Sequence, residues 1–463
     1  MSRRVVRGGT VVTASGAFAA DVLIDDEEIA AVGALGDVDA EAIDASGCFV
    51  LPGLIDNHTH MAMPFGGTHS IDDYDTGTRA AAAGGTTCIV DFVIQQEGGG
   101  LRSSLEEWRG RAEGAAHVDY GFHMAITQAD EGTFADMAPM VEEEGICTFK
   151  VFLAYPGVLM VRDDLFFRAL EHSRDLGALL MVHCENGWAI DVLVQRALQA
   201  GRRTPIHHAL TRPEELEAEA TGRAVRFAEL TRAAVYIVHV TCGRAMEEIS
   251  IGQARGVDVS GETCLQYLTN TVEDLERPDF EGARYVCSPP LRDVRNHDLL
   301  WGALKRGVLE SVSTDHCPFN SEQKALGRED FSKIPNGLAM IQHRLVKLWD
   351  LGVEAGRITP SELVDLTSTA IAKRFGLSRK GSIAPGMDAD LVVFDPATPF
   401  EFSTRTSHMN VDYDLFEGET STGSVRHTFC RGTLVYDRGE IRTQPGHGRF
   451  VPRSLSGSEL VAS

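Results

Sequence analysis

Apolar runs alternate with amphipathic helical stretches through residues 53–375, and this alternation constrains the fold more than any other feature. Eight runs have the length and composition of buried strands: 54–60, 86–93, 119–126, 147–153, 178–183, 235–240, 257–262 and 309–315. Strict alternation implies parallel pairing, and eight units favour a (β/α)8 barrel of the α/β class. An open doubly wound sheet is the alternative, but it would carry a Gly-rich phosphate loop where this chain has His58-Thr59-His60.

Both ends of the chain have a different pattern: short strand-like runs, such as Thr10–Thr13, separated by turn residues. We therefore predict a small β-sandwich domain built from both termini, residues 1–52 and 376–445. It would flank a catalytic (β/α)8 barrel of residues 53–375. Residues 446–463 are predicted to form a C-terminal tail that is loosely held or packs on a neighbouring subunit.

The charge balance argues against partners that need a positive surface. The 463 residues include 43 Lys and Arg and 67 Asp and Glu, a formal net charge of −24 at pH 7. Nucleic acid and anionic membrane surfaces attract concentrated positive charge, so neither is expected as a partner. The sequence also has no run of about 18 apolar residues that could span a membrane.

The nine cysteines are expected to be free thiols in a reducing compartment, because they are scattered, odd in number and never form a C-x-x-C pair. Cys184 and Cys317 neighbour candidate site residues, so a metal role stays open for them. The N-terminus resembles a secretion signal only faintly, since Arg7, Gly8 and Gly9 interrupt its apolar part. We expect a cytoplasmic protein.

The first barrel strand ends in two histidines that together form half of a metal site. His58 and His60 lie two residues apart and therefore on one face of the strand, which Asp56 shares. Taken alone, a strand-end His is more often a core residue and a strand-end Asp can be a helix N-cap. The common location at carboxyl ends of strands predicts a metal centre at the barrel mouth. The further candidate ligands at strand ends are Lys150, His183, His239 and Asp315.

Lys150 is the unusual member, because a lysine ending an apolar strand is costly to bury while charged. An ion pair with a nearby carboxylate is the structural explanation. The functional alternative is addition of CO2 to the amine, giving an anionic carbamate able to bridge two metal ions. Imidazole and carboxylate donors favour two divalent ions, Zn²⁺ above all, with Mn²⁺, Co²⁺ or Fe²⁺ as substitutes. Asp315 could also carry a proton from the attacking water to a leaving nitrogen; His316 is the weaker candidate.

The segments around these positions form motifs in a fixed order: PGLIDNHTH (52–60), MPFGGT (63–68), DDYDTGTRAAAAGGTT (72–87), FKVFLAY (149–155), VHCENG (182–187), GETCLQYL (261–268), CSPPLR (287–292), STDHCPF (313–319) and IPNGL (334–338). With them the chain resembles the cyclic amidohydrolases of the amidohydrolase superfamily, and most closely their D-hydantoinase and dihydropyrimidinase group. The resemblance covers nearly the whole chain.

This resemblance implies a (β/α)8 barrel with a β-sandwich from both termini, and a binuclear zinc site. His58 and His60 match the pair that binds the first metal, and His183 and His239 match the pair that binds the second. Lys150 matches the carboxylated lysine that bridges the metals. Asp315 matches the family's carboxylate ligand and proton shuttle. Tyr155 matches a tyrosine that stabilises the developing oxyanion. Ser288 and Asn336 match positions whose backbone groups bind the substrate ring.

The implied reaction is hydrolysis of the cyclic amide bond of hydantoins or dihydropyrimidines to N-carbamoyl amino acids, by attack of a metal-bridging hydroxide. The substrate would be a small cyclic ureide, and Asp315 and Tyr155 would be the catalytic residues. Members of the family are commonly homotetramers, so a homotetramer is expected here.

The chain departs from the family pattern at Tyr155-Pro156-Gly157, at Leu338–Gln342 and at Leu265, the last in place of a common proline. None of these changes removes a ligand, but the first two flank the substrate and leave its side-chain preference open. A cyclic imide or allantoin hydrolase is therefore an alternative. A non-enzymatic dihydropyrimidinase-like scaffold is a remote one, because such scaffolds have lost ligands that this chain retains.

Overall fold

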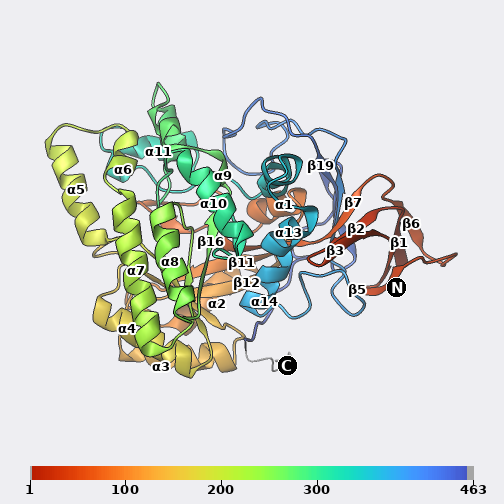
Figure 1. Ribbon diagram of the computed structural model, residues 1–463, viewed down its shortest axis with the longest axis horizontal. Helices are drawn as coiled ribbons and strands as arrows, with labels where there is room; N and C mark the ends of the chain where they lie inside the picture. The colour runs from red at the N-terminus through yellow and green to blue at the C-terminus, as the bar shows by residue number, and fades with distance from the viewer. Residues whose placement is uncertain (1–2, 456–463) are drawn as a thin grey trace.

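A computed structural model of the protein describes residues 3–455, and its centre is an eight-stranded parallel sheet (Figure 1). The order in the sheet is β17-β16-β15-β14-β13-β12-β11-β8. The strands are β8 Leu54–Thr59, β11 Thr86–Ile94, β12 Asp119–Ala125, β13 Thr148–Phe152, β14 Leu179–His183, β15 Val235–Ile237, β16 Val259–Cys264 and β17 Ser311–Ser313. Each strand overlaps one of the eight predicted runs, so the barrel is confirmed.

The two edge strands of this sheet meet through a loop and a buried arginine. A parallel bridge pairs Thr59 with His316, and the His60 N–H donates to the His316 carbonyl at 2.9 Å. Arg344 Nη1 donates to the carbonyl of Ile55 on β8 at 2.9 Å and to that of Val312 on β17 at 3.2 Å. The guanidinium thus satisfies carbonyls from both edges and joins them.

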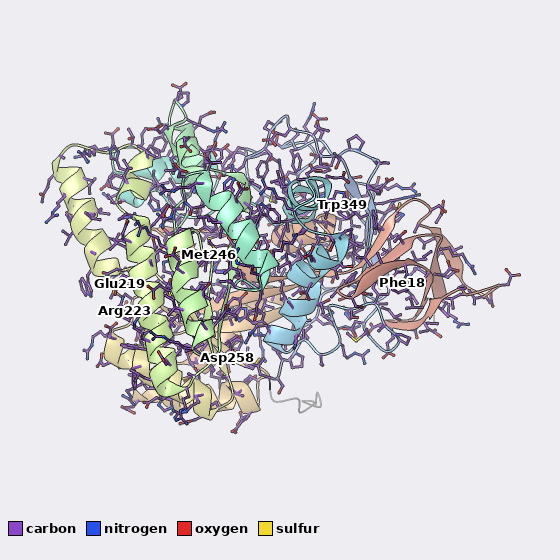
Figure 2. All side chains as sticks on the ribbon, viewed as in Figure 1. Phe18, Glu219, Arg223, Met246, Asp258 and Trp349 are labelled. Carbon is purple, nitrogen blue, oxygen red and sulfur yellow. The ribbon has the colours of Figure 1, made fainter. Side chains whose placement is uncertain are left out.

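Helices cover the outside of the barrel, and the longer ones bury an apolar face. In α4 the buried residues are Phe166, Ala169, Leu170 and Ser173, spaced as one helical face. On α7, Glu219 and Arg223 lie on the outer side, as Figure 2 shows, and they form an i,i+4 ion pair. The helices are α1 Thr76–Ala83, α2 Leu101–Ala112, α3 Glu131–Glu142, α4 Asp163–Asp175, α5 Gly187–Gln199, α6 Ile206–Leu210, α7 Glu214–Thr231, α8 Gly243–Ala254, α9 Gln266–Thr269, α10 Arg295–Lys305, α11 Ser321–Lys324, α12 Arg344–Leu348, α13 Pro360–Val364 and α14 Ala370–Phe375.

Shorter helical turns connect these elements. The 3-10 turns are η1 Val272–Glu276, η2 Glu281–Tyr285, η3 Ala325–Gly327 and η4 Phe331–Lys333, and the π-helical turns are η5 Trp349–Glu354 and η6 Asp365–Thr369. A small hairpin of β9 Pro64–Phe65 and β10 Thr68–His69 follows the first barrel strand.

The remaining strands form the β-sandwich expected from the two ends of the chain. One sheet has the order β5-β4-β1-β6 and the other β21-β20-β19-β18-β7-β2-β3, so the second sheet mixes N-terminal and C-terminal strands. Aliphatic side chains such as Val11, Ile24 and Leu391 fill the core between them. The strands are β1 Arg3–Arg7, β2 Thr10–Thr13, β3 Gly16–Ala19, β4 Asp21–Asp25, β5 Glu28–Gly33, β6 Glu41–Asp44, β7 Phe49–Pro52, β18 Leu391–Asp395, β19 Ser424–Cys430, β20 Thr433–Asp437 and β21 Glu440–Ile441.

A buried ion cluster links this sandwich to the amino end of the barrel strands. Lys380 Nζ lies 2.8 Å from Asp119 Oδ2 at the start of β12 and 2.7 Å from Asp390 Oδ2 beside β18. Arg431 Nε adds a contact of 3.0 Å to Asp119. The cations balance the clustered carboxylates, so the link is an ion-pair network.

The C-terminal segment differs from the expectation of a loosely held or neighbour-bound tail. The Tyr120 N–H donates to the Arg449 carbonyl at 2.9 Å, and the Val451 N–H donates to the Tyr120 carbonyl at 2.7 Å. Arg453 is fully buried and donates to Thr148 Oγ1 at 2.8 Å. The prediction is wrong up to Leu455, because backbone and guanidinium donors tie the segment to its own barrel. Residues 456–463 of the predicted tail lie outside the described residues.

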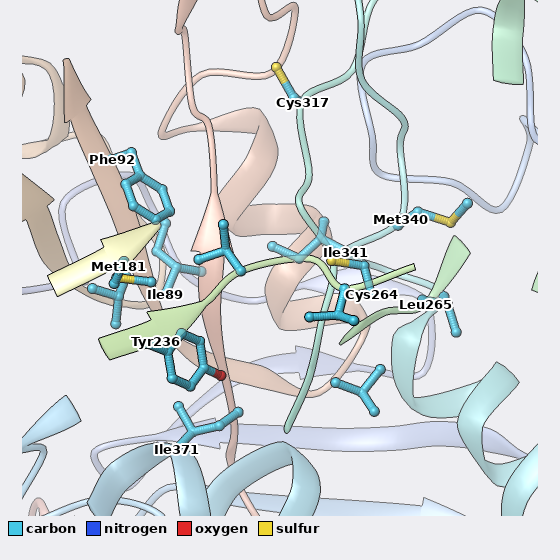
Figure 3. Packing of buried hydrophobic residues seen from close by; sticks show 14 of the residues in the cluster. Ile89, Phe92, Met181, Tyr236, Cys264, Leu265, Cys317, Met340, Ile341 and Ile371 are labelled. Carbon is cyan, nitrogen blue, oxygen red and sulfur yellow. The ribbon is translucent and has the colours of Figure 1, made fainter. Parts of the chain in front are cut away.

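Apolar side chains fill the barrel interior, beneath the polar residues at the carboxyl ends of the strands. Figure 3 shows Ile89, Met181 and Tyr236 together in this core. The Tyr236 hydroxyl is hydrogen-bonded to Ser311 Oγ at 2.8 Å. All nine cysteines are buried free thiols, as the sequence predicts. Within residues 3–455, no helix is long and apolar enough to cross a bilayer.

Candidate metal centre

The structure brings all six predicted ligands together at the carboxyl ends of the barrel strands. The positions follow from the strand boundaries, since each ligand lies at, or within two residues of, the end of its strand. All six side chains are buried, and the most accessible residue, Asp315, is 8% exposed. The six residues are His58 and His60 from β8 and its end, Lys150 from β13, His183 from β14, His239 after β15 and Asp315 after β17.

One half of the cluster is centred on the Asp315 carboxylate. Its Oδ1 lies 3.1 Å from His60 Nε2 and 3.2 Å from His58 Nε2. One donor atom from each of these three residues lies within 4.8 Å of the others. Lys150 Nζ is 3.1 Å from the same His58 nitrogen, so Lys150 lies beside this half.

The second half consists of His183 and His239. His183 Nδ1 lies 2.9 Å from His239 Nε2. The ring centres of His239 and His58 are 5.4 Å apart, so the two halves adjoin. The Lys150 ammonium lies over the Phe92 ring at 4.0 Å from its centre and over Phe152 at 4.9 Å.

Three residues of the site have left-handed backbone conformations, which are uncommon outside glycine. The φ angles are +42° at His239, +48° at Asp315 and +65° at Tyr155. Such conformations cost free energy and persist only where the surrounding structure enforces them. Their occurrence at three residues around one pocket indicates that the fold accepts local strain to aim these side chains.

Two buried glutamates that sequence reasoning missed determine which imidazole nitrogens face the centre. Glu262 Oε1 lies 2.5 Å from His58 Nδ1, and Glu185 Oε2 lies 2.8 Å from His183 Nε2. A carboxylate accepts the ring N–H, which leaves His58 Nε2 and His183 Nδ1 as the lone-pair donors. Both glutamates had a signal in the sequence: Glu262 ends the predicted strand 257–262, and Glu185 follows His183 at i+2.

Burial sets the protonation states that metal binding requires. It lowers the pKa of His58, His60 and His239, so their imidazoles are neutral donors. Burial also lowers the pKa of Lys150 to about 8, although the Asp315 and Glu262 carboxylates oppose this shift. For Asp315, burial raises the pKa, but the neighbouring His58, His60 and Lys150 outweigh it and bring the pKa to about 2.

This donor set fits a divalent metal pair. Imidazole nitrogens of His183 and His239 face each other at 2.9 Å, and two neutral nitrogen lone pairs at that distance repel unless a proton or a cation lies between them. The carboxylate of Asp315 and the amine of Lys150 complete a set of nitrogen and oxygen donors of the kind that zinc and related ions bind.

A pocket opens above the centre, and its walls contain the three residues expected to contact substrate. Asn336 Nδ2 donates to Ser288 Oγ at 3.1 Å, and both side chains line the pocket together with Tyr155. Burial raises the pKa of Tyr155, so its hydroxyl remains a protonated donor. The apolar part of the lining consists of Met63, Phe65, Phe152 and Leu159.

Comparison with known proteins identifies the family. The sequence matches the amidohydrolase family over residues 49–435. The chain belongs to the amidohydrolase family. It is 48% identical to a D-hydantoinase from Geobacillus stearothermophilus over 99% of this chain and 98% of the relative. A D-hydantoinase from Streptomyces coelicolor is also 48% identical, over 98% of both chains.

The solved structures agree with the sequence comparison. The dihydropyrimidinase of Brevibacillus agri superposes with a TM-score of 0.97 at 49% identity, covering 98% of this amidohydrolase and 99% of that chain.

His316 and Asp56, which lie near the metal-ligand candidates in the sequence, hold neighbouring residues in place in this amidohydrolase. His316 does not line the pocket; its Nε2 lies 3.0 Å from Asp72 Oδ2, and its Nδ1 accepts from the Met340 N–H at 3.1 Å. Asp56 lies below the cluster and accepts a hydrogen bond of 2.6 Å from Thr314 Oγ1, which holds the residue before Asp315. Neither group of clustered ligand atoms found among the described residues includes a cysteine.

Proposed function

We propose that this amidohydrolase opens the cyclic amide bond of small ureides, hydantoins and dihydropyrimidines, to give N-carbamoyl amino acids. The observation that carries the proposal is the convergence of six buried metal-ligand candidates beneath a pocket walled by Tyr155, Ser288 and Asn336. The D-hydantoinase and dihydropyrimidinase names of the full-length relatives support this substrate class.

In this proposal the centre holds two divalent ions, and Zn²⁺ is the preferred metal. His58 and His60 hold one ion, His183 and His239 hold the other, and Asp315 contributes a carboxylate oxygen. When bound, the ions supply Lewis acidity that polarises the amide carbonyl and lowers the pKa of the attacking water.

Lys150 is proposed to act as a carbamate. The neutral amine attacks CO2 to form an N–C bond and releases one proton to solvent, which leaves an anionic carbamate. Its surroundings support this step, because Nζ contacts His58 and the faces of two phenylalanines rather than an ion-pair partner. Burial brings the pKa of Lys150 to about 8, so roughly a tenth of the amine is unprotonated at pH 7 and about half at pH 8.

The protons and charges of the ring opening are assigned to two side chains. Asp315, ionised at neutral pH, accepts a proton from the attacking water and delivers it to the ring nitrogen as the C–N bond breaks. The Tyr155 hydroxyl donates a hydrogen bond to the oxygen that becomes negative, a contribution of about 3 kcal/mol in comparable sites. Ser288 and Asn336 orient the ring.

The apolar lining from Phe65, Phe152 and Leu159 is proposed to hold the ring substituent. This lining favours apolar 5-substituted hydantoins over allantoin, whose substituent is a polar ureido group. The retained ligand set argues against a non-enzymatic scaffold. The proposal also includes the domain division given above, a homotetrameric assembly and a cytoplasmic location.

A substrate panel tests this function. Zinc-loaded protein is assayed with dihydrouracil, hydantoin, 5-phenylhydantoin, succinimide and allantoin, and its metal content is measured in parallel. We expect two metal ions per chain and fast opening of dihydrouracil or the hydantoins. Preference for succinimide or allantoin would refute the substrate class, and a protein that binds no metal would refute the mechanism.

A further inference from the structure

The pocket wall that carries Ser288 and Asn336 is made of two loop segments, residues 286–288 and 335–337. Neither segment belongs to a helix or strand. They are joined directly by the Gly337 N–H, which donates to the Val286 carbonyl at 2.9 Å, and by the hydrogen bond of 3.1 Å from Asn336 Nδ2 to Ser288 Oγ. Their relative position therefore depends on the few groups that link them.

Lys324, the last residue of α11, binds both segments from behind. Its Nζ donates to the carbonyls of Val286 at 2.9 Å, Pro335 at 2.8 Å and Gly337 at 2.9 Å. An ammonium has three N–H donors, so these carbonyls use its full capacity. Lys324 is 1% exposed and does not line the pocket.

The start of α11 is itself held in place, which fixes where the lysine stem begins. Asn320 and Gln323 form a capping box: the Gln323 N–H donates to Asn320 Oδ1 at 2.9 Å, and the Asn320 N–H donates to Gln323 Oε1 at 2.9 Å. The ammonium therefore acts as a fixed point against which the two loops are placed.

Packing alone does not account for a lysine at this position. The Phe319 ring centre lies 5.6 Å from the ammonium, and the Cys287 and Cys317 thiols and the neutral His208 imidazole are close enough to interact with it electrostatically. Burial lowers the pKa of Lys324 to about 7, whereas the three carbonyls that accept its N–H groups favour the protonated form with three donors. A methionine would fill similar space without desolvating a charge, so what the lysine adds is its three hydrogen bonds.

Holding the carbonyls also aims the adjoining N–H groups. In a trans peptide plane the C=O and N–H bonds point in opposite directions, so a Pro335 carbonyl directed at Lys324 directs the Asn336 N–H away from it. Among the described residues, no acceptor hydrogen-bonds this N–H. It is thus available to a ligand in the pocket that Asn336 lines.

We propose that Lys324 is a positioning residue for substrate binding, whose ammonium holds residues 286–288 and 335–337 so that Ser288 and Asn336 meet the cyclic ureide ring. This inference rests on the proposed function. It separates ring binding, which depends on Lys324, from the metal centre, which does not contact it.

Lys324→Met tests the proposal, with Lys347→Met as the matched control. Lys347 is also nearly buried, at 7% exposure, but its Nζ pairs with Glu419 at 2.5 Å, and it does not line the pocket. We expect Lys324→Met to raise KM for the best ureide roughly tenfold, the effect of one lost interaction with the substrate. The kcat and zinc content of Lys324→Met should stay close to wild type. Lys347→Met should leave KM, kcat and zinc content unchanged.

Lys324→Gln is the second variant, because it retains two of the three donors, and its KM should fall between those of wild type and Lys324→Met. Wild-type KM in a folded Lys324→Met protein would overturn the inference, and so would a loss of kcat together with zinc. Misfolding of both Lys324 variants while Lys347→Met folds would overturn it in favour of a purely structural role. Inactive wild-type protein on every ureide would instead refute the proposed function.

Discussion

The contact between Glu262 and His58 gives the sharpest test of how the protein prepares its metal centre. Glu262 is fully buried on β16, and its Oε1 accepts the N–H of His58 Nδ1 at 2.5 Å. Asn57 and the Tyr236 hydroxyl, the latter at 3.3 Å, bind its other oxygen. The perturbation is Glu262→Gln, which keeps the shape and removes the negative charge.

The expected magnitude follows from the kind of hydrogen bond that is lost. A hydrogen bond to a charged group contributes about 1.5–3 kcal/mol, against about 1 kcal/mol for a neutral one. The difference, about 0.5–2 kcal/mol, corresponds to a loss of roughly 2- to 30-fold in zinc affinity, which overlaps the range of about 10- to 100-fold known for groups that orient metal ligands. Burial raises the pKa of Glu262 to about 8, so the loss should grow between pH 7 and 9 as the wild-type carboxylate ionises.

The assay is a zinc titration of the metal-free protein against a competing chelator. Asp91→Asn is the matched control, because Asp91 is equally buried and accepts hydrogen bonds from Thr59 Oγ1 at 2.9 Å and the Met61 N–H at 3.0 Å, but from no ligand side chain. The reasoning is refuted if folded Glu262→Gln binds zinc as tightly as wild type at pH 9, or if Asp91→Asn weakens binding equally.

Three further predictions concern residues with proposed chemical roles. Lys150→Ala should lose zinc and activity together, with partial rescue by short carboxylic acids. In the wild-type protein, the rate of CO2-dependent zinc loading should rise about tenfold per pH unit up to about pH 8. The reason is that the pKa of Lys150 is lowered to about 8 and only the neutral amine reacts with CO2. A loading rate that does not depend on pH would contradict the carbamate. Asp315→Ala should reduce kcat by roughly 100-fold or more in a steady-state assay, as for a lost acid–base group, and a loss under tenfold would assign the proton to water. Tyr155→Phe should lower kcat more than it raises KM, and the reverse pattern would make Tyr155 a binding residue.

The arrangement of elements could be predicted from the sequence because its signals are local. Alternation of apolar runs with helical stretches predicted the eight barrel strands, and the short strands at both ends predicted the sandwich. The same locality made the metal ligands recognisable: carboxyl ends of parallel strands meet at one face, so residues such as His58 and Asp315 had to lie near each other once the barrel closed.

The sequence could not predict the groups that aim those ligands, because their contacts join residues far apart in the chain. Glu262 and His58 are 204 residues apart, and nothing in the sequence around either residue predicts the other as its partner. Sequence spacing placed Asp56 on the face of His58, but it could not show that Asp56 pairs with Thr314, which lies 258 residues away.

By itself, the sequence determined which elements form and which side chains stand at the strand ends, since periodicity and turn residues act over a few positions. Only the tertiary structure decided which imidazole nitrogen is free, how Arg344 joins the barrel edges and how Lys324 holds two loops with one ammonium. It also decided that the C-terminal segment up to Leu455 packs on its own barrel. The physical reason is that a buried polar group must find its partner wherever the fold brings one within about 3 Å, whatever the distance along the chain.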